Sequence, residues 1–121
     1  MDGLIINVSS WSGNHVSLLS GVSYTSSKHA LNAMTETINM KYCNYGIRAC
    51  ALCPGEVSTA ILDKRPKKLT IEQKNKMLQP DDLGETISFL CQMPKHVCIN
   101  ELTISPTWHR RYIADLGIEK L

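Results

Sequence analysis

Two short apolar runs, residues 4–9 and 47–53, flank a long stretch, residues 24–44, that contains neither glycine nor proline. Short apolar runs are typical of strands that a parallel sheet buries on both faces. Apolar residues in the intervening stretch recur at steps of three and four, which is the spacing of one helix face. These residues are Leu31, Met34, Ile38 and Tyr42. The order strand, helix, strand predicts a βαβ unit, so we expect an α/β fold in which this helix face packs on a parallel sheet.

The rest of the chain extends this unit. Thr70 and Gln73 have the spacing of a capping box, which predicts a short helix. Pro80 followed by two aspartates is a typical helix start, and residues 83–91 carry an apolar face. Residues 97–104 are a candidate third strand. The sequence therefore predicts about three parallel strands with flanking helices.

Composition excludes several functional classes. The chain has 121 residues, of which 43% are hydrophobic and 20% charged, and its formal net charge is +2. This balance indicates no nucleic-acid or membrane partner, and no apolar run approaches the ~20 residues that span a bilayer. The first residues lack the basic and apolar segments of a secretion signal, so a cytoplasmic location is expected. In a reducing compartment the 5 cysteines are expected to remain thiols. The sequence lacks four metal ligands at a suitable spacing, so no metal site is expected.

A tyrosine and a lysine that lie one helical turn apart form the first candidate site. Tyr24 and Lys28 are spaced by four residues, so their side chains share a helix face. A nearby positive charge favours the phenolate form of a tyrosine, which lets the hydroxyl work as an acid or base. Such a pair is more often a plain surface pair. Its context supports chemistry, because Ser10 follows the first strand, residues 54–59 follow the second, and ligands gather where parallel strands end.

Three motifs together resemble the C-terminal half of the short-chain dehydrogenase/reductase family, across residues 2–107. The motifs are Ile-Ile-Asn-Val-Ser-Ser at residues 5–10 with Gly13, Tyr-Thr-Ser-Ser-Lys at residues 24–28 with Ala30, and Pro54-Gly55 through Thr59. The resemblance implies a partial, Rossmann-like, doubly wound domain over residues 1–107 with a C-terminal tail, residues 108–121. Residues 93–100 with residues 105–107 are also similar to carbonyl reductases of the serine 3-dehydrogenase type.

The resemblance implies roles for the catalytic residues. Tyr24 would protonate a carbonyl oxygen, or remove the proton of an alcohol in the reverse direction. Lys28 would favour ionisation of Tyr24 and bond the nicotinamide ribose. Ser10 would donate to the substrate oxygen, as an oxyanion donor does, and Ser9 is a less suited substitute. The expected activity is reduction of a small carbonyl, or oxidation of a secondary alcohol, with NADP or NAD as cofactor.

The same resemblance implies a set of cofactor contacts. Pro54, Gly55 and Val57 would shape the nicotinamide pocket, with the Val57 backbone holding the carboxamide. Thr59 would bond the carboxamide or a phosphate. Tyr24 and Lys28 complete the expected set of cofactor-binding residues.

One part of the family pattern is missing from the sequence. A doubly wound dinucleotide fold has two halves, and its glycine-rich phosphate loop lies in the first half. The glycines of this chain are isolated, so no residue is assigned to adenosine, and we expect a truncated form. The alternative is a non-catalytic fragment that keeps the dimerisation helix, because the helix with Tyr24 forms homo-oligomer interfaces in this family.

Three smaller features each have a purely structural and a functional interpretation. Cys50 and Cys53 have CxxC spacing within an apolar strand, which favours buried thiols over a redox pair. The basic residues at 64–68 are expected to form a solvated loop, with an anionic substrate as the weaker alternative. Trp11 and His15 follow Ser10 in a loop that borders the substrate in the resembled family, although a histidine in a loop is usually just exposed.

Overall fold

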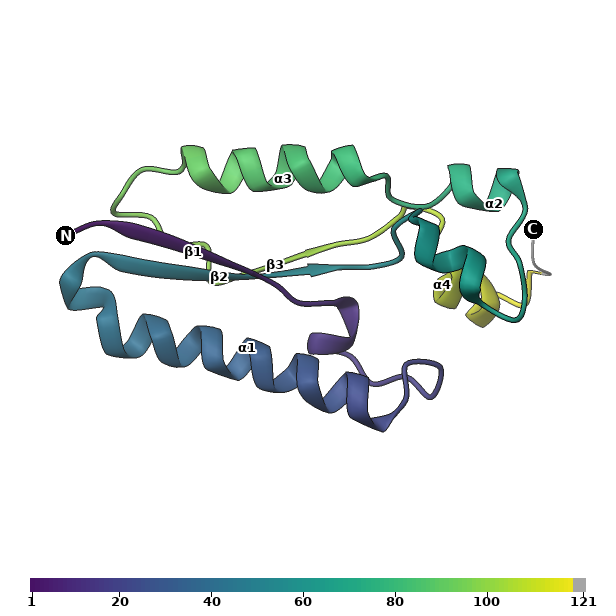
Figure 1. Ribbon diagram of the computed structural model, residues 1–121, viewed down its shortest axis with the longest axis horizontal. Helices are drawn as coiled ribbons and strands as arrows, with labels where there is room; N and C mark the ends of the chain where they lie inside the picture. The colour runs from purple at the N-terminus through teal and green to yellow at the C-terminus, as the bar shows by residue number, and fades with distance from the viewer. Residues whose placement is uncertain (119–121) are drawn as a thin grey trace.

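The computed structural model describes residues 1–118 and forms three layers, with a central sheet between two long helices (Figure 1). The strands are β1 (Gly3–Val8), β2 (Ile47–Pro54) and β3 (Glu101–Ile104). The α-helices are α1 (Val22–Tyr42), α2 (Ile71–Asn75), α3 (Pro80–Gln92) and α4 (Arg110–Asp115). Short 3-10 helices are η1 (Trp11–Gly13), η2 (Cys43–Tyr45) and η3 (Ala60–Lys64). None of the helices within residues 1–118 is long and apolar enough to cross a membrane.

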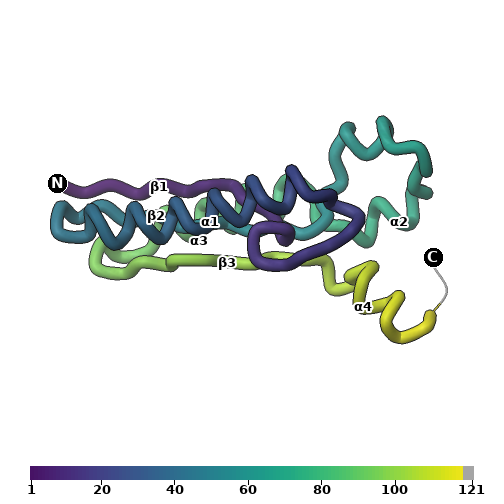
Figure 2. Tube along the Cα trace, turned by 90° about the horizontal axis from the view of Figure 1, so that it is seen from below, coloured from purple at the N-terminus to yellow at the C-terminus, as the bar shows by residue number. Residues whose placement is uncertain are grey.

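The sheet is parallel, as the sequence predicts. Its order is β1-β2-β3, with Gly3 opposite Ile47 and Ala51 opposite Glu101. In Figure 2 the three strands lie side by side with β2 in the middle, while Figure 1 shows α1 and α3 on opposite faces. All three strands therefore end at the same edge, where α2, η3 and α4 also lie. This arrangement is the C-terminal part of a doubly wound, Rossmann-like sheet.

Burial concentrates on β2. Residues 49–53 of this strand are nearly inaccessible, at 0–2% exposure. The prediction that the first strand is buried on both faces is wrong, because Ile5 is 40% and Val8 is 51% exposed. The physical reason is position: β1 pairs with β2 along one side only, within the part of the chain that the structure describes.

The helix face that packs on the sheet is only partly the predicted one. Leu31 and Ile38 are half-buried, as predicted, but Met34 is 50% and Tyr42 is 40% exposed.

Polar side chains of the packed face bond the sheet directly. Thr35 is 1% exposed, and Asn7 donates to its Oγ1 at 2.9 Å. Asn39 bonds the backbone of Ala49. The small side chains of β2 let the helix approach closely enough for these short polar groups to reach the strands.

The third strand is shorter than the predicted residues 97–104. The guanidinium of Arg48 donates to the carbonyl oxygens of Met93, Pro94 and Val97 at 2.6–3.2 Å. These bonds pair backbone carbonyl groups of the segment between α3 and β3 with a side chain instead of a neighbouring strand. Pairing with β2 therefore begins only at Glu101. The predicted capping box at Thr70 and the helix start at Pro80 are both confirmed.

Candidate active site

Ser9 and Ser10, the two candidates for a hydrogen-bond donor to the substrate, make different contacts at the end of β1. Ser9 is 4% exposed, and its hydroxyl donates to the carbonyl of Lys28 at 3.4 Å. Ser10 caps η1 instead, with its Oγ accepting from the Ser12 N–H at 3.1 Å. Because the backbone here is extended, successive side chains point to opposite sides. Ser9 therefore packs against α1, while the hydroxyl proton of Ser10 remains available to a ligand.

The backbone of Gly13 packs closely against two side chains in the turn that carries Ser10. A Cβ atom at Gly13 would lie 2.5 Å from Ser9 Oγ and 2.8 Å from the Asn32 amide. Asn32 in turn donates to the Cys53 sulfur at 3.5 Å, so the turn, α1 and β2 meet at one point. A Cβ at position 13 would displace the Ser9 hydroxyl and the Asn32 amide from their bonds, which favours glycine at this place in the motif.

Tyr24 and Lys28 lie together on the N-terminal part of α1. The Lys28 ammonium is 5.7 Å from the centroid of the Tyr24 ring and donates to the Val8 carbonyl at 3.2 Å. This bond holds the lysine at the end of β1, two residues before Ser10. The Tyr24 ring is 46% exposed, so its hydroxyl can meet a ligand from outside.

The loop after β2 passes over the neighbouring strand end. The N–H of Gly55 donates to the Ile104 carbonyl at 2.7 Å, and a Cβ at this position would lie 3.2 Å from the Ser105 Cβ. Pro54 is the last residue of β2 and is half-buried. Gly55 thus lets the loop cross β3 in close contact.

Val57 presents its backbone N–H and C=O on the side away from Leu78. It forms an isolated parallel bridge to Leu78, in which Leu78 N–H donates to the Glu56 carbonyl at 3.1 Å and Ser58 N–H donates to the Leu78 carbonyl at 2.8 Å. In a parallel bridge of this pattern, the N–H and C=O of the central residue point to the opposite side. Thr59 precedes η3, is exposed, and makes no capping bond to this described helix through its side chain.

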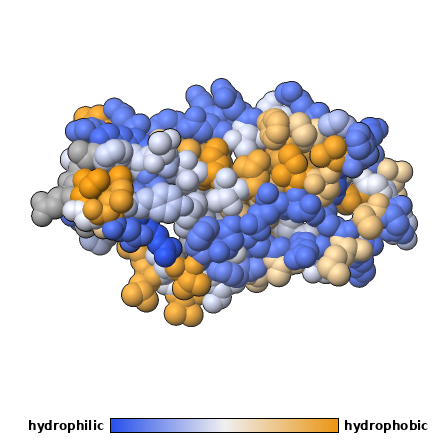
Figure 3. Space-filling model, turned by 180° about the vertical axis from the view of Figure 1, so that it is seen from behind, coloured by the Kyte–Doolittle hydropathy of each residue, from blue (hydrophilic) through white to orange (hydrophobic). Residues whose placement is uncertain are grey.

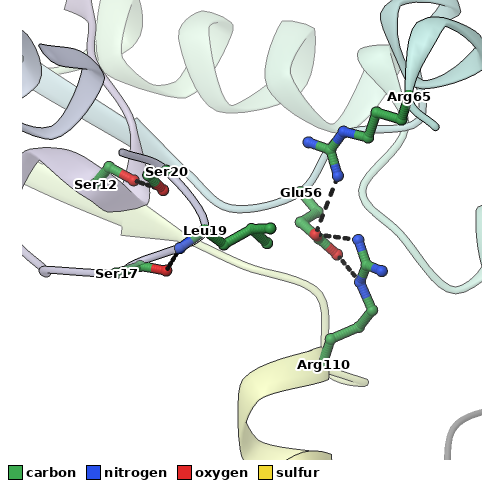
Figure 4. Close-up of polar contacts among 7 residues, drawn as sticks. All are labelled: Ser12, Ser17, Leu19, Ser20, Glu56, Arg65 and Arg110. Carbon is green, nitrogen blue, oxygen red and sulfur yellow. Dashed lines mark hydrogen bonds and ion pairs between the residues drawn. The ribbon is translucent and has the colours of Figure 1, made fainter. Parts of the chain in front are cut away.

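One carboxylate is held by two arginines, a contact that the sequence does not predict. Arg110 of α4 donates to both oxygens of Glu56, at 2.5 and 2.7 Å, and Arg65 lies 3.9 Å from the same carboxylate (Figure 4). The bond to Glu56 raises the pKa of Arg110 above its ordinary value. The partners are 54 positions apart in the chain, so no local spacing could have identified the pair.

The tail also contributes to an aromatic cluster beside Ser10. The rings of Trp11 and His15 stack at 4.0 Å, and His109 lies 4.5 Å from Trp11 and 4.3 Å from Tyr112, between ring centroids. Burial in this cluster lowers the pKa of His109, against an opposing effect of Glu56. The loop predicted to border the substrate is therefore covered in part by α4.

The CxxC cysteines are buried thiols, as the sequence predicts. Cys50 is 1% and Cys53 is 0% exposed. Burial, with smaller contributions from Cys98 and Cys53, raises the pKa of Cys50 to about 11. These thiols are therefore protonated and inert near neutral pH.

The sequence model of a family described as "short chain dehydrogenase" matches residues 1–70. The chain is 36% identical over 115 residues to the human protein "Dehydrogenase/reductase SDR family member 11", covering 88% of this chain and 44% of that protein. It is 31% identical over 104 residues to an uncharacterized oxidoreductase of Staphylococcus aureus (strain USA300), covering 86% of this chain and 42% of that protein. The chain thus spans less than half the length of these curated relatives.

Solved structures share the arrangement of strands and helices. An alcohol dehydrogenase from Thermococcus sibiricus, complexed with 5-hydroxy-NADP, has a TM-score of 0.71 at 27% identity, covering 88% of this chain and 43% of that chain. A betaketoacyl-[ACP] reductase from Bacteroides thetaiotaomicron has a TM-score of 0.69 at 31% identity, covering 92% and 43%. A serine dehydrogenase from Escherichia coli has a TM-score of 0.67 at 22% identity, covering 85% and 39%, and shows the fold alone.

Proposed function

The chain belongs to the short-chain dehydrogenase family, and from this premise we propose that it carries the catalytic residues of an NAD(P)-dependent oxidoreductase. The proposed reaction is reduction of a carbonyl, or oxidation of a secondary alcohol. One observation carries the proposal: Lys28 lies 5.7 Å from the Tyr24 ring while its ammonium is bonded at the end of the strand that leads to Ser10. A proton donor, a positive charge and a hydroxyl donor are thereby gathered at one strand end.

The loop after β2 has the right groups for a nicotinamide. A carboxamide needs one hydrogen-bond donor and one acceptor, and the Val57 N–H and C=O that point away from Leu78 supply both. Pro54 and Gly55 would border the ring, and the free hydroxyl of Thr59 would bond the carboxamide or a phosphate. When bound, the nicotinamide supplies or accepts the hydride. Solved structures of similar fold hold 5-hydroxy-NADP, NADP+ and NADH, so we propose a nicotinamide nucleotide without a choice between NADP and NAD.

Each catalytic residue then has a separate task. Ser10 donates its hydroxyl proton to the substrate oxygen and orients it. Tyr24 gives that oxygen a proton during reduction and removes it during oxidation. Lys28 holds a positive charge beside the phenol and bonds the ribose. A reducing, cytoplasmic location stays a prediction.

Replacement of the tyrosine tests this assignment. Tyr24→Phe is expected to lower turnover by roughly 10²–10⁴-fold, because general acid catalysis contributes that much. Tyr42→Phe is the matched control, since Tyr42 lies at the other end of α1 and is 40% exposed. The assay is carbonyl-dependent oxidation of NADPH or NADH, with circular dichroism to verify folding. Equal turnover in the wild type and in Tyr24→Phe would refute the assignment.

A second candidate is a non-catalytic chain that pairs through α1. Four large side chains at its outer face and in η2 support it. They are Met34, Met40, Tyr42 and Tyr45, which are 50%, 76%, 40% and 54% exposed. Dimers of a folded chain without turnover would favour this candidate, and turnover that depends on Tyr24 would exclude it.

A further inference from the structure

The segment between η1 and the start of α1 presents large apolar side chains to solvent. Val16, Leu18, Leu19 and Val22 are 74–102% exposed. Hydrogen bonds hold this segment: the Leu19 N–H donates to Ser17 Oγ at 3.2 Å, and the Ser12 and Ser20 hydroxyls bond each other at 2.8 Å (Figure 4). In Figure 3 apolar atoms project from the lower edge of the molecule, at the end where α4 lies. An apolar loop, residues 16–22, that is held in solvent in this way indicates an interaction surface.

Further apolar side chains are exposed on the elements around the apolar loop. Ile61 of η3, Ile71 of α2 and Leu116 after α4 are 68–79% exposed. In Figure 1 α2, α4 and the apolar loop all lie toward the same end of the molecule. Leu19 borders the same cavity as Arg65 and Lys67, so the apolar loop lies beside the basic residues at 64–68.

Positive charge is concentrated next to the apolar loop. Residues 56–76 contain six of the 13 basic residues of the chain and three of its 11 acidic residues. The three acids are already paired, Glu56 with Arg110, Asp63 with Lys74 and Glu72 with Lys76. Lys64, Lys67 and Lys68 are exposed and form no ion pair among residues 1–118. The basic segment, residues 64–68, is therefore solvated, as predicted, and its lysines can meet a negatively charged partner.

The combination of the two features selects the partner. Exposed aliphatic side chains enter the boundary between lipid head groups and acyl chains, while neighbouring lysines attract anionic head groups. A second copy of the chain is a poorer match, because a symmetric contact would place the lysines of one basic segment near those of the other. A contact of this kind requires no helix that spans the bilayer.

We propose that the apolar loop and the basic segment together bind the protein to the surface of an anionic lipid membrane. Leu18, the most exposed of the aliphatic residues in the loop, would enter the lipid, and the lysines would lie at the head groups. The composition predicts no membrane partner because the net charge of the whole chain is only +2. The structure instead gathers the positive charge at one end, beside the apolar loop.

Sedimentation of the full 121-residue chain with lipid vesicles tests the proposal. One set of vesicles is phosphatidylcholine alone, and the other contains about one third phosphatidylserine. Binding to the anionic vesicles is expected to be roughly 100-fold tighter, because each of three lysines contributes about a factor of five. This binding should weaken between about 0.1 M and about 0.5 M salt, since salt screens the lysines. Equal binding to both vesicles, or no binding to the anionic ones, would overturn the proposal.

Matched variants test the location of the contact. Leu18→Gln is expected to weaken binding to the anionic vesicles about tenfold or more, because a leucine side chain no longer enters the lipid. Met40→Gln is the control, since Met40 is 76% exposed near the other end of α1 (Figure 1). Lys67→Glu is expected to weaken binding about 30-fold, and Lys95→Glu, in the exposed connection between α3 and β3, less than twofold. Equal effects within either pair would overturn the location.

Self-association is the competing use of the same surface. Sedimentation velocity of the chain without lipid measures it, and a monomer whose binding to anionic vesicles depends on Leu18 and Lys67 is the result expected. A dimer that Leu18→Gln dissociates, in a chain that does not sediment with anionic vesicles, would overturn the proposal in favour of a contact between copies.

Discussion

Removal of the Asn39 side chain is predicted to destabilise the chain strongly, because this amide replaces a missing stretch of strand. The side chain accepts from the Ala49 N–H at 2.6 Å and donates to the Ala49 carbonyl at 2.7 Å. Ala49 is 0% exposed, and β3 pairs with β2 only from Ala51 onward. The Cys98 thiol, 3.7 Å from the same carbonyl, is a weak donor. Asn39→Ala therefore leaves a buried N–H unpaired and a buried carbonyl poorly paired.

The expected loss follows from the number of groups affected. Each unsatisfied buried group costs about 1–3 kcal/mol, so Asn39→Ala should lower the free energy of unfolding by about 2–4 kcal/mol. With a urea dependence of about 2 kcal/mol per M, the middle of the usual range, the midpoint should fall by about 1–2 M. Urea unfolding followed by circular dichroism measures this shift. Asn75→Ala, at an exposed position at the end of α2, is the control and should shift the midpoint little.

A midpoint for Asn39→Ala equal to that of the control variant would mean that water, and not the Asn39 amide, satisfies the Ala49 backbone. The polar interface between α1 and β2 would then contribute little to stability.

Two further predictions follow from the shifted pKa values. Cys50, with its pKa raised to about 11 by burial, should resist iodoacetamide at pH 8 in the folded chain, while exposed Cys43 reacts; mass spectrometry of the alkylated chain checks this, and equal rates would contradict the buried position. His109 has its pKa lowered below 6.5 by burial, so the unfolded chain binds its proton first and stability should fall as the pH drops below 6.5. His109→Gln should lose less Tm than the wild type between pH 7.5 and pH 5.5, and parallel losses would show that this imidazole is not responsible.

Much of the fold could be predicted from local patterns. The strand at residues 47–53, the helix start at Pro80 and the capping box at Thr70 depend on neighbouring residues, and the structure confirms all three. The inclusion of Thr35 and Asn39 in the helix face that packs on the sheet could not be predicted this way. Its contacts depend on Asn39 reaching a strand end that β3 leaves open, which is a property of the assembled sheet.

The candidate site likewise contains residues that local patterns predict and residues that they do not. Ser10, Tyr24 and Lys28 belong to motifs with fixed spacing, so the sequence alone singles them out. The Glu56–Arg110 pair joins residues that are 54 positions apart in the chain. No local pattern relates the tail to the loop after β2, so only the folded chain brings these residues together.

The strand ends of this chain are proposed to form a nicotinamide site. Calorimetric titration of the folded chain with NADPH and with NADH measures this binding, with circular dichroism recorded on the same sample. Saturable binding of at least one nucleotide is expected, retained in Tyr42→Phe and weakened in Lys28→Met. A folded chain that binds neither nucleotide, or that binds equally well after Lys28→Met, would show that the strand ends are not a nicotinamide site.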